Sequence, residues 1–282
     1  MTATPASRTT RAAATVLAAG ALLALSACGS SSSSSKAASG SSAPASSSAS
    51  STATAAAVKG KIVVFAAASL QQVFTTLGKE FEAANPGTTV SFNFSGSGTL
   101  AASITSGAPA DVFAAASDAT MQTVTKAGDT PTAPVTFTKN ILEIGVAPGN
   151  PKHITSLADL TKPGIKVALC AKTEPCGAAA VTALADAGVK LTPVTYEADV
   201  TSAQNVVEEG QVDASLVYRT NILGAPGKIT GVNFATAEQA ITDYPIAVLK
   251  NAPNSAGGQA FVNFVLSSTG QKVLTAAGFQ QP

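Results

Sequence analysis

Four places where a helix is expected to begin carry groups suited to holding an anion. Ser69 follows a strand-like run and precedes a helical pattern as its expected N-cap, and Ser97 lies in a glycine-rich turn before another helix. A Pro-Cys-Gly run at Cys176 opens a third helix, and Val200 follows Asp199, the expected N-cap of a fourth. First-turn N–H groups lack intrahelical acceptors and lie at the positive end of the helix dipole. Each feature alone is ordinary, but several converging turns would form an anion site without cationic side chains.

The sequence offers little for catalysis or for a bound metal ion. Its single histidine, His153, lies beside Lys152 in a loop rich in proline and glycine, where a solvated side chain is expected. A serine or cysteine nucleophile usually needs a positioned base, and zinc usually takes several histidine or cysteine ligands. The Gly-Ser-Gly turn at residues 96–98 lacks the third glycine and downstream acid of a dinucleotide fingerprint. We therefore expect neither an enzyme nor a cofactor.

Cys170 and Cys176 enclose five residues. In an oxidising envelope the favoured state of such a pair is a disulfide. The alternative is a pair of free thiols with Cys176 as a nucleophile, which again lacks a base.

The charge of the chain argues against nucleic acid as a partner. The 282 residues hold 17 basic and 16 acidic side chains, a net charge of +1, and no basic field that could engage phosphates. Residues 1–58 carry Arg8, Arg11 and Lys36 and no acidic residue, which leaves 14 basic and 16 acidic side chains, a net charge of −2, in residues 59–282. Any anion must therefore bind to a mildly acidic body.

The N-terminal residues are typical of an export signal. Arg8 and Arg11 precede a short apolar run over residues 12–25, which predicts a signal peptide over residues 1–27 rather than a membrane-spanning helix. The run ends in Leu-Ser-Ala-Cys28, which resembles the lipobox of bacterial lipoproteins, so lipidation of Cys28 is expected; an ordinary signal peptide with an incidental cysteine is the alternative. Residues 28–58 are rich in serine and alanine and predict a flexible tether to an extracytoplasmic domain.

Residues 59–282 show a regular alternation of strand-like and helix-like patterns. An apolar run at residues 61–65 is followed by Leu70, Val73, Phe74 and Leu77 at helical spacing. Further strands are expected at residues 90–94, 111–115, 141–147, 165–169, 193–196, 213–218 and 244–249, and helices at 99–106, 118–126, 177–187, 200–209, 257–266 and 269–276, with a short one near 157. This order predicts an α/β fold with mainly parallel sheets, which we expect to be divided between two lobes.

Several motifs, in this order, resemble the periplasmic molybdate-binding proteins of ABC importers. The similarity spans about residues 60–279, and the first three motifs are the most specific. They are residues 65–70 (FAAASL), 94–100 (FSGSGTL), 107–113 (GAPADVF), 175–177 (PCG), 198–200 (ADV), 216–218 (LVY), 244–248 (YPIAV) and 278–279 (GF).

The resemblance implies a two-lobed periplasmic binding protein of type II that holds molybdate, and tungstate too, between its lobes. The ligand residues that it implies are the hydroxyls of Ser69, Ser97 and Tyr218 and the backbone amides of Cys176 and Val200. The glycine-rich turn at residues 95–98 departs from the usual serine run, and many relatives carry alanine at the position of Cys176. No lysine or arginine is expected to touch the ligand.

The resemblance also implies lobe boundaries, a hinge and partners. Lobe 1 is expected over about residues 59–138 and 245–282, and lobe 2 over 139–244, with the crossings near 137–140 and 242–244 as the hinge. The expected partner is an ABC permease, and the expected state is a lipid-anchored monomer on the outer face of the cell membrane.

Three other functions stay open from the sequence. One is a receptor for another tetrahedral oxyanion such as sulfate, on the same fold. A second is an envelope hydrolase that uses Ser69 or a free Cys176. The third is a purely structural lipoprotein.

Overall fold

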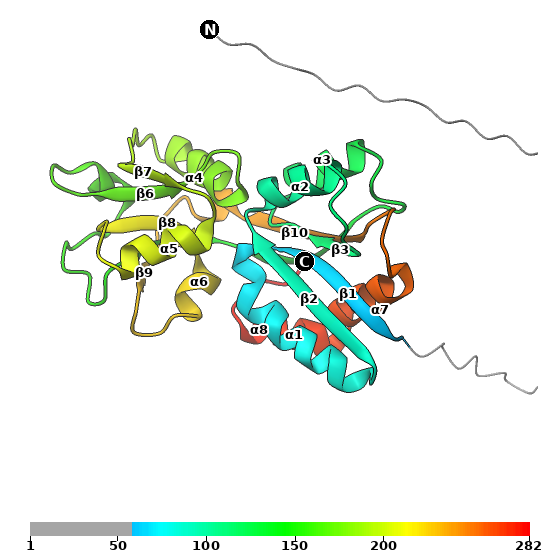
Figure 1. Ribbon diagram of the computed structural model, residues 1–282. Coiled ribbons are helices and arrows are strands. Elements are labelled where there is room, and N and C mark those ends of the chain that lie inside the picture. Colours follow the sequence, from blue (N-terminus) through cyan, green and yellow to red (C-terminus); the bar gives the residue numbers. More distant parts are fainter. Residues whose placement is uncertain (1–57) are drawn as a thin grey trace, which may run out of the picture. The chain divides into compact units, whose positions relative to one another are not determined.

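The computed structural model describes residues 58–282 (Figure 1). The predicted signal peptide, Cys28 and residues 28–57 of the expected tether lie outside these residues. Within residues 58–282, no helix has both the length and the apolar character needed to cross a membrane.

The first of two five-stranded sheets has the strand order β2-β1-β3-β10-β4. Strands β2, β1 and β3 are parallel, whereas β10 runs antiparallel to both of its neighbours. Their bounds are β1 (Gly60–Ala67), β2 (Thr88–Ser95), β3 (Val112–Ala114), β4 (Val135–Asn140) and β10 (Thr242–Val248).

The second sheet has the order β7-β6-β8-β5-β9, in which β7, β6 and β8 are parallel and β5 runs antiparallel to both of its neighbours, as β10 does in the first sheet. Its strands are β5 (Leu142–Val146), β6 (Val167–Cys170), β7 (Thr195–Glu197), β8 (Ala214–Tyr218) and β9 (Thr230–Val232). Each sheet with its helices forms one lobe, so the predicted two-lobed α/β fold is confirmed.

Helices cover both faces of the first sheet, with α2 and α3 on one side and α1, α7 and α8 on the other (Figure 1). The bounds of the helices in both lobes are α1 (Gln71–Ala84), α2 (Ser97–Thr105), α3 (Asp118–Lys126), α4 (Pro175–Asp186), α5 (Val200–Glu208), α6 (Arg219–Leu223), α7 (Ser255–Leu266) and α8 (Ser268–Ala276), with short 3-10 turns η1 (Ala68–Leu70), η2 (Leu157–Thr161) and η3 (Glu238–Ala240).

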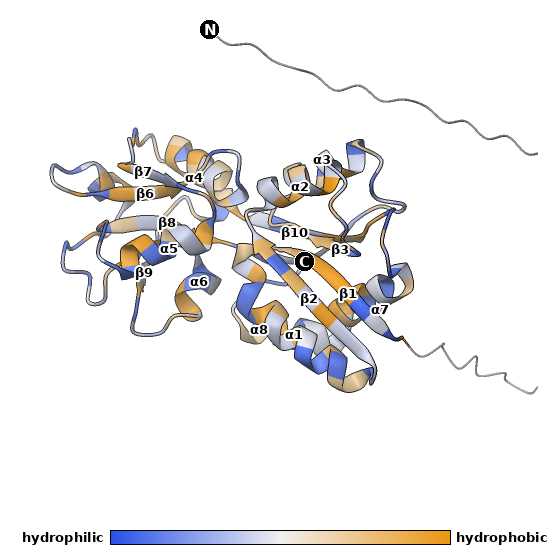
Figure 2. Ribbon diagram, in the orientation of Figure 1, coloured by the Kyte–Doolittle hydropathy of each residue, from blue (hydrophilic) through white to orange (hydrophobic). Residues whose placement is uncertain are grey.

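Strand β1 shows how the sequence builds this layering. Its residues Ile62, Val64 and Ala66 pack into the core on the α1 and α7 side, whereas Phe65 packs with Leu100 on the α2 side. A strand buried on both faces is apolar throughout, because successive side chains point to opposite faces. The resulting apolar strand is visible in Figure 2.

The chain passes between the sheets through β4 and β10. These strands pair as far as Thr242 and Asn140, and β5 of the other sheet begins two residues after Asn140. The two connections between the lobes therefore lie side by side. The lobe boundaries and the hinge role stay predictions.

The sequence did not predict β4, β9 and α6, nor the short 3-10 turns η1 and η3. The prediction of Ser69 as an N-cap is wrong, because η1 comes first and α1 begins at Gln71 with Leu70 in the N-cap position. The Ser69 hydroxyl instead bonds to a residue far along the chain, as described below. By contrast, the prediction of Asp199 as N-cap of α5 is confirmed, since its side chain accepts a hydrogen bond from Ser202 N.

Candidate anion-binding site

A small cavity of about 10 Å³ lies where four helix starts and the end of β8 meet. The helix starts are those of η1, α2, α4 and α5, so the convergence that the sequence left open is present in the structure. The lining residues are Ala67, Ala68, Ser69, Gly96, Ser97, Ala116, Glu174, Pro175, Cys176, Asp199, Val200 and Tyr218.

All five residues that the resemblance implied lie on this cavity: Ser69, Ser97, Cys176, Val200 and Tyr218. The first two belong to the lobe of the first sheet and the other three to the lobe of the second. Their binding of a ligand stays a prediction, but their gathering in one place is a fact of the fold.

The Ser69 hydroxyl is oriented by a hydrogen-bond chain that starts between the lobes. The Asn140 side-chain oxygen accepts from Ile141 N (3.0 Å), which leaves its Nδ2 to donate to the Tyr244 hydroxyl (3.3 Å) and to Thr220 Oγ1 (2.8 Å). With its oxygen accepting from Asn140, Tyr244 can donate its own hydrogen to Ser69 Oγ, 2.8 Å away. The Ser69 hydrogen is then free to point into the cavity.

The Ser97 hydroxyl, like that of Ser69, is oriented by a hydrogen bond that its oxygen accepts. Its Oγ accepts a hydrogen bond from Ala116 N (3.0 Å) and the side chain is buried. A hydroxyl that accepts one bond keeps its own hydrogen for donation. Ser97 therefore faces the cavity as a donor.

The backbone amides of Cys176 and Val200 lie in the first turns of α4 and α5, where N–H groups have no intrahelical acceptor. Cys176 is joined to Cys170 by a disulfide with an S–S distance of 2.07 Å. Gly177 follows because a Cβ at that position would collide with the backbone carbonyl of Ala171. The disulfide ties the start of α4 to the end of β6.

Tyr218 ends β8 and brings its hydroxyl to the cavity. The residue is 1% exposed, and its hydroxyl makes no hydrogen bond of ordinary geometry within residues 58–282, although the hydroxyls of Thr242 and Tyr244 lie near it. Burial raises the pKa of this phenol to about 12. At neutral pH Tyr218 is therefore a neutral hydroxyl with a hydrogen to donate, and burying a hydroxyl without a partner costs free energy.

The charged groups on the cavity are carboxylates that are already engaged. Asp199 accepts from Ser202 N (2.9 Å), and Glu174 accepts from the first turn of α2. Among the described residues, no lysine or arginine lines the cavity. Sequence reasoning missed Glu174, although its place directly before Pro175, the first residue of α4, marked it as an N-cap position.

The structure speaks against the hydrolase alternative. Cys176 is engaged in the disulfide, so it is not a free thiol. His153 is exposed in a loop and does not line the cavity, so Ser69 has no histidine base beside it.

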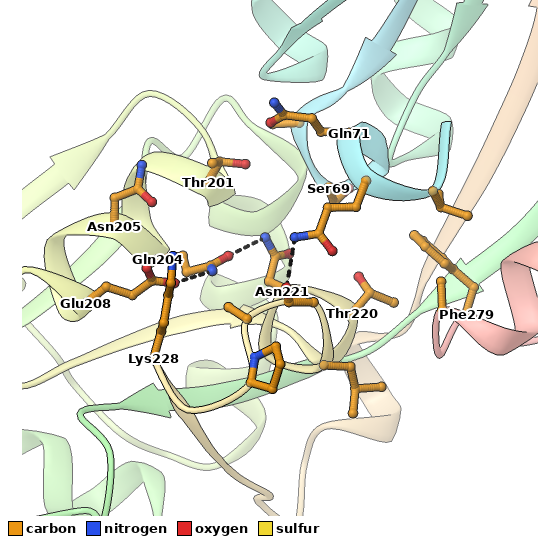
Figure 3. A pocket seen from close by; sticks show the side chains of 18 of the residues that line it. Ser69, Gln71, Thr201, Gln204, Asn205, Glu208, Thr220, Asn221, Lys228 and Phe279 are labelled. Carbon is orange, nitrogen blue, oxygen red and sulfur yellow. Dashed lines mark hydrogen bonds between the residues drawn. The ribbon is translucent and has the colours of Figure 1, made fainter. Parts of the chain in front are cut away.

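A larger cavity of about 590 Å³ adjoins the small one and shares Ala68 and Ser69 with it (Figure 3). Its walls carry side-chain amides: Asn221 Nδ2 donates to Gln204 Oε1 (2.9 Å), and Gln72 Nε2 donates to Gly224 O in the other lobe (3.0 Å). Lys228, Gln71 and Asn205 also line this cavity, so it is a polar space that contains a cationic side chain, unlike the small one.

Residues 62–280 match the family described as bacterial extracellular solute-binding protein. The chain belongs to this family. This solute-binding protein is 45% identical over 221 residues to the molybdate-binding protein ModA of Mycobacterium tuberculosis, which covers 78% of this chain and 85% of the relative. Membership of a solute-binding family confirms the expectation that the protein is not an enzyme.

Two solved structures show the same fold as this solute-binding protein. The periplasmic molybdate-binding protein of Azotobacter vinelandii has a TM-score of 0.71 at 21% identity, covering 78% of this chain and 99% of that one. The sulfate-binding protein SubI of Mycobacterium tuberculosis has a TM-score of 0.68 at 21% identity, covering 79% and 87%. Identities this low establish the fold and leave the choice of oxyanion to the site itself.

Proposed function

We propose that this solute-binding protein captures molybdate between its lobes, accepts tungstate as well, and delivers the anion to an ABC permease. The observation that carries the proposal is a cavity to which the five predicted residues bring hydrogen-bond donors while both carboxylates are engaged elsewhere. The relative at 45% identity, named for molybdate, supports the same choice of ligand.

The donor set suits an oxyanion that is fully deprotonated at neutral pH. Such an anion only accepts hydrogen bonds, whereas a protonated anion such as hydrogen phosphate also needs an acceptor. Hydrogen bonds to a charged group contribute about 1.5–3 kcal/mol each, so five donors supply about 7–15 kcal/mol. Nanomolar affinity corresponds to about 12 kcal/mol, so the set can reach it only if the costs of ordering and closure stay small.

The size of the cavity supports binding coupled to lobe movement. A volume of about 10 Å³ corresponds to roughly one water-sized body. A tetrahedral oxyanion is larger, so the lobes must separate to admit it and then close on it. A ligand that contacts Ser69 and Ser97 on one lobe and Tyr218 on the other favours the closed form by its differential affinity.

Isothermal titration calorimetry with molybdate, tungstate, sulfate and phosphate tests the proposal. We expect tight binding of molybdate and tungstate and little heat with phosphate. Absence of heat with molybdate below millimolar concentration would contradict the assignment of molybdate as the ligand. Tight sulfate binding with weak molybdate binding would favour the sulfate receptor, which uses the same fold.

We also infer the setting in which the protein works. The predicted signal peptide and Cys28 support a lipid anchor on the outer face of the cell membrane. The anchored protein is proposed to be a monomer. Its lobe 1 is proposed over residues 59–138 and 245–282 and its lobe 2 over 139–244, bounds that the two connections between the sheets, near Asn140 and Thr242, support. Radiolabelled palmitate should label the protein in cells and fail to label a Cys28→Ala variant. Equal labelling of both would contradict the anchor.

A further inference from the structure

A buried carboxylate crosses from one lobe to the other beside the candidate site. Glu174, at the start of α4, accepts a hydrogen bond at Oε2 from Gly98 N (2.8 Å). Its Oε1 accepts from both Thr99 N and Thr99 Oγ1, each at 3.1 Å. Glu174 is only 4% exposed. Helices α2 and α4 lie next to each other at this junction (Figure 1).

Through this contact a residue of one lobe caps a helix of the other lobe. Glu174 holds the N-cap position of α4, yet its side chain makes no capping bond to α4. It caps α2 instead, whose own N-cap, Gly96, has no side chain. A carboxylate at a helix N-terminus is stabilising, and bonds to an ionised acceptor are the stronger kind. Helix α2 is thus capped only while the lobes are together, and the first amides of α4 stay free.

The glycines of the turn at residues 95–98 are explained by the close approach of residues 173–174. A Cβ at Gly96 would collide with the carboxylate of Glu174, and a Cβ at Gly98 would lie 2.8 Å from the carbonyl oxygen of Thr173. Gly96 has φ −57° and ψ 137°, which any residue adopts, so its backbone does not require glycine. Gly96 and Glu174 therefore fit each other across the cleft.

We propose that Glu174 is a positioning residue that latches the two lobes together in the absence of ligand. This inference rests on the proposed function for the idea that the ligand enters between the lobes. The carboxylate cannot attract an anion, since both charges are negative, so its contribution is to closure. Loss of the latch should open the ligand-free protein and speed release of bound anion.

The test follows ligand-free protein by amide hydrogen exchange at Gly98 and Thr99 and by small-angle X-ray scattering. Glu174→Gln removes the charge, and Gly96→Ala displaces the carboxylate without changing it. Both variants should exchange these two amides at least tenfold faster and show a larger radius of gyration. Glu238→Gln, which removes an exposed charge of the same lobe, should match the wild type.

Thr99→Val keeps the charge of Glu174 and removes one of its three hydrogen-bond donors, so it should accelerate exchange less than the other two variants do. As the mildest change, it also tests the latch if Glu174→Gln or Gly96→Ala fails to fold. Unchanged exchange and radius in both Glu174→Gln and Gly96→Ala would overturn the latch. Faster exchange with an unchanged radius would make Glu174 a helix cap only and also overturn it. The exchange and scattering measurements use ligand-free protein, so they do not depend on the identity of the ligand. Failure of molybdate binding in calorimetry would therefore reject the proposed function and leave the result on the latch unaffected.

Discussion

Tyr218→Phe is the substitution that best separates a ligand-binding role from a structural one. The ring of Tyr218 packs edge-on against Tyr244, with centroids 6.0 Å apart, and the phenylalanine ring can keep this contact. The hydroxyl has no hydrogen-bond partner within residues 58–282, although it is buried. The nearby hydroxyls of Thr242 and Tyr244 make no hydrogen bond of ordinary geometry to it, so its removal should not destabilise the ligand-free protein but should cost the complex one donor.

The structure sets the magnitude of each effect. Loss of one hydrogen bond to a charged ligand costs about 1.5–3 kcal/mol, which raises the Kd for molybdate about 10- to 150-fold. Removal of an unpaired buried hydroxyl stabilises a protein by about 1 kcal/mol, which for a domain of this size raises the Tm by about 2–4 °C. Affinity and stability should therefore change in opposite directions.

Calorimetry and thermal unfolding without ligand measure the two effects, and the other two tyrosines serve as controls. Tyr196 is 50% exposed and does not line the cavity, so Tyr196→Phe should change neither the Kd for molybdate nor the Tm. Tyr244→Phe breaks the 2.8 Å contact with Ser69 and should lower both the affinity for molybdate and the Tm. A Tyr218→Phe variant with a lowered Tm and an unchanged Kd would refute the reasoning, because the hydroxyl would then be structural.

Three further predictions follow from the same contacts. Ser97→Ala should weaken molybdate binding at least tenfold and lower the free energy of unfolding by about 1–3 kcal/mol, because Ala116 N loses its acceptor; an unchanged stability would contradict the contact. Reduction of the Cys170–Cys176 disulfide should lower the free energy of unfolding by about 2 kcal/mol, measured by urea unfolding with and without reductant, and equal midpoints would argue against the bridge. Burial raises the pKa of Tyr218 from its usual value near 10 to about 12, so the stability that comes from keeping this phenol neutral is complete below pH 10 and is lost between pH 10 and 12, by roughly 3 kcal/mol. Because burial also raises the pKa of Tyr244, the Tyr218→Phe variant should lose less stability than the wild type over this range in unfolding experiments, and an equal loss in both would contradict the assignment.

Local sequence patterns predicted the elements whose signals are contained within a few residues. Asp199 could be recognised as a cap because an N-cap side chain bonds to an amide three residues ahead. Helix α1 could be recognised from its apolar spacing. Strand β4, Val135–Asn140, was missed even though Val135 and Phe137 alternate with threonines, and β9 has only three residues, too few to show a period.

The candidate site was predicted in part, and what was missed depends on distant residues. Motif resemblance identified five residues that do gather around one cavity. The role of Ser69 could not be foreseen, because its partner Tyr244 lies 175 positions away. Glu174 was overlooked for the same reason, since Gly98 is 76 positions away and in the other lobe.

The amino-acid sequence was sufficient for the α/β class, the positions of most helix starts and the absence of a basic field, because these depend on composition and short-range spacing. The order of strands within each sheet and the meeting of four helix starts at one cavity depend on how the elements pack. Which hydroxyl keeps a free hydrogen, and which carboxylate caps a helix of the opposite lobe, are settled by contacts between residues far apart in the chain. Hydrogen bonds act over about 3 Å, so their partners are known only once the chain is folded.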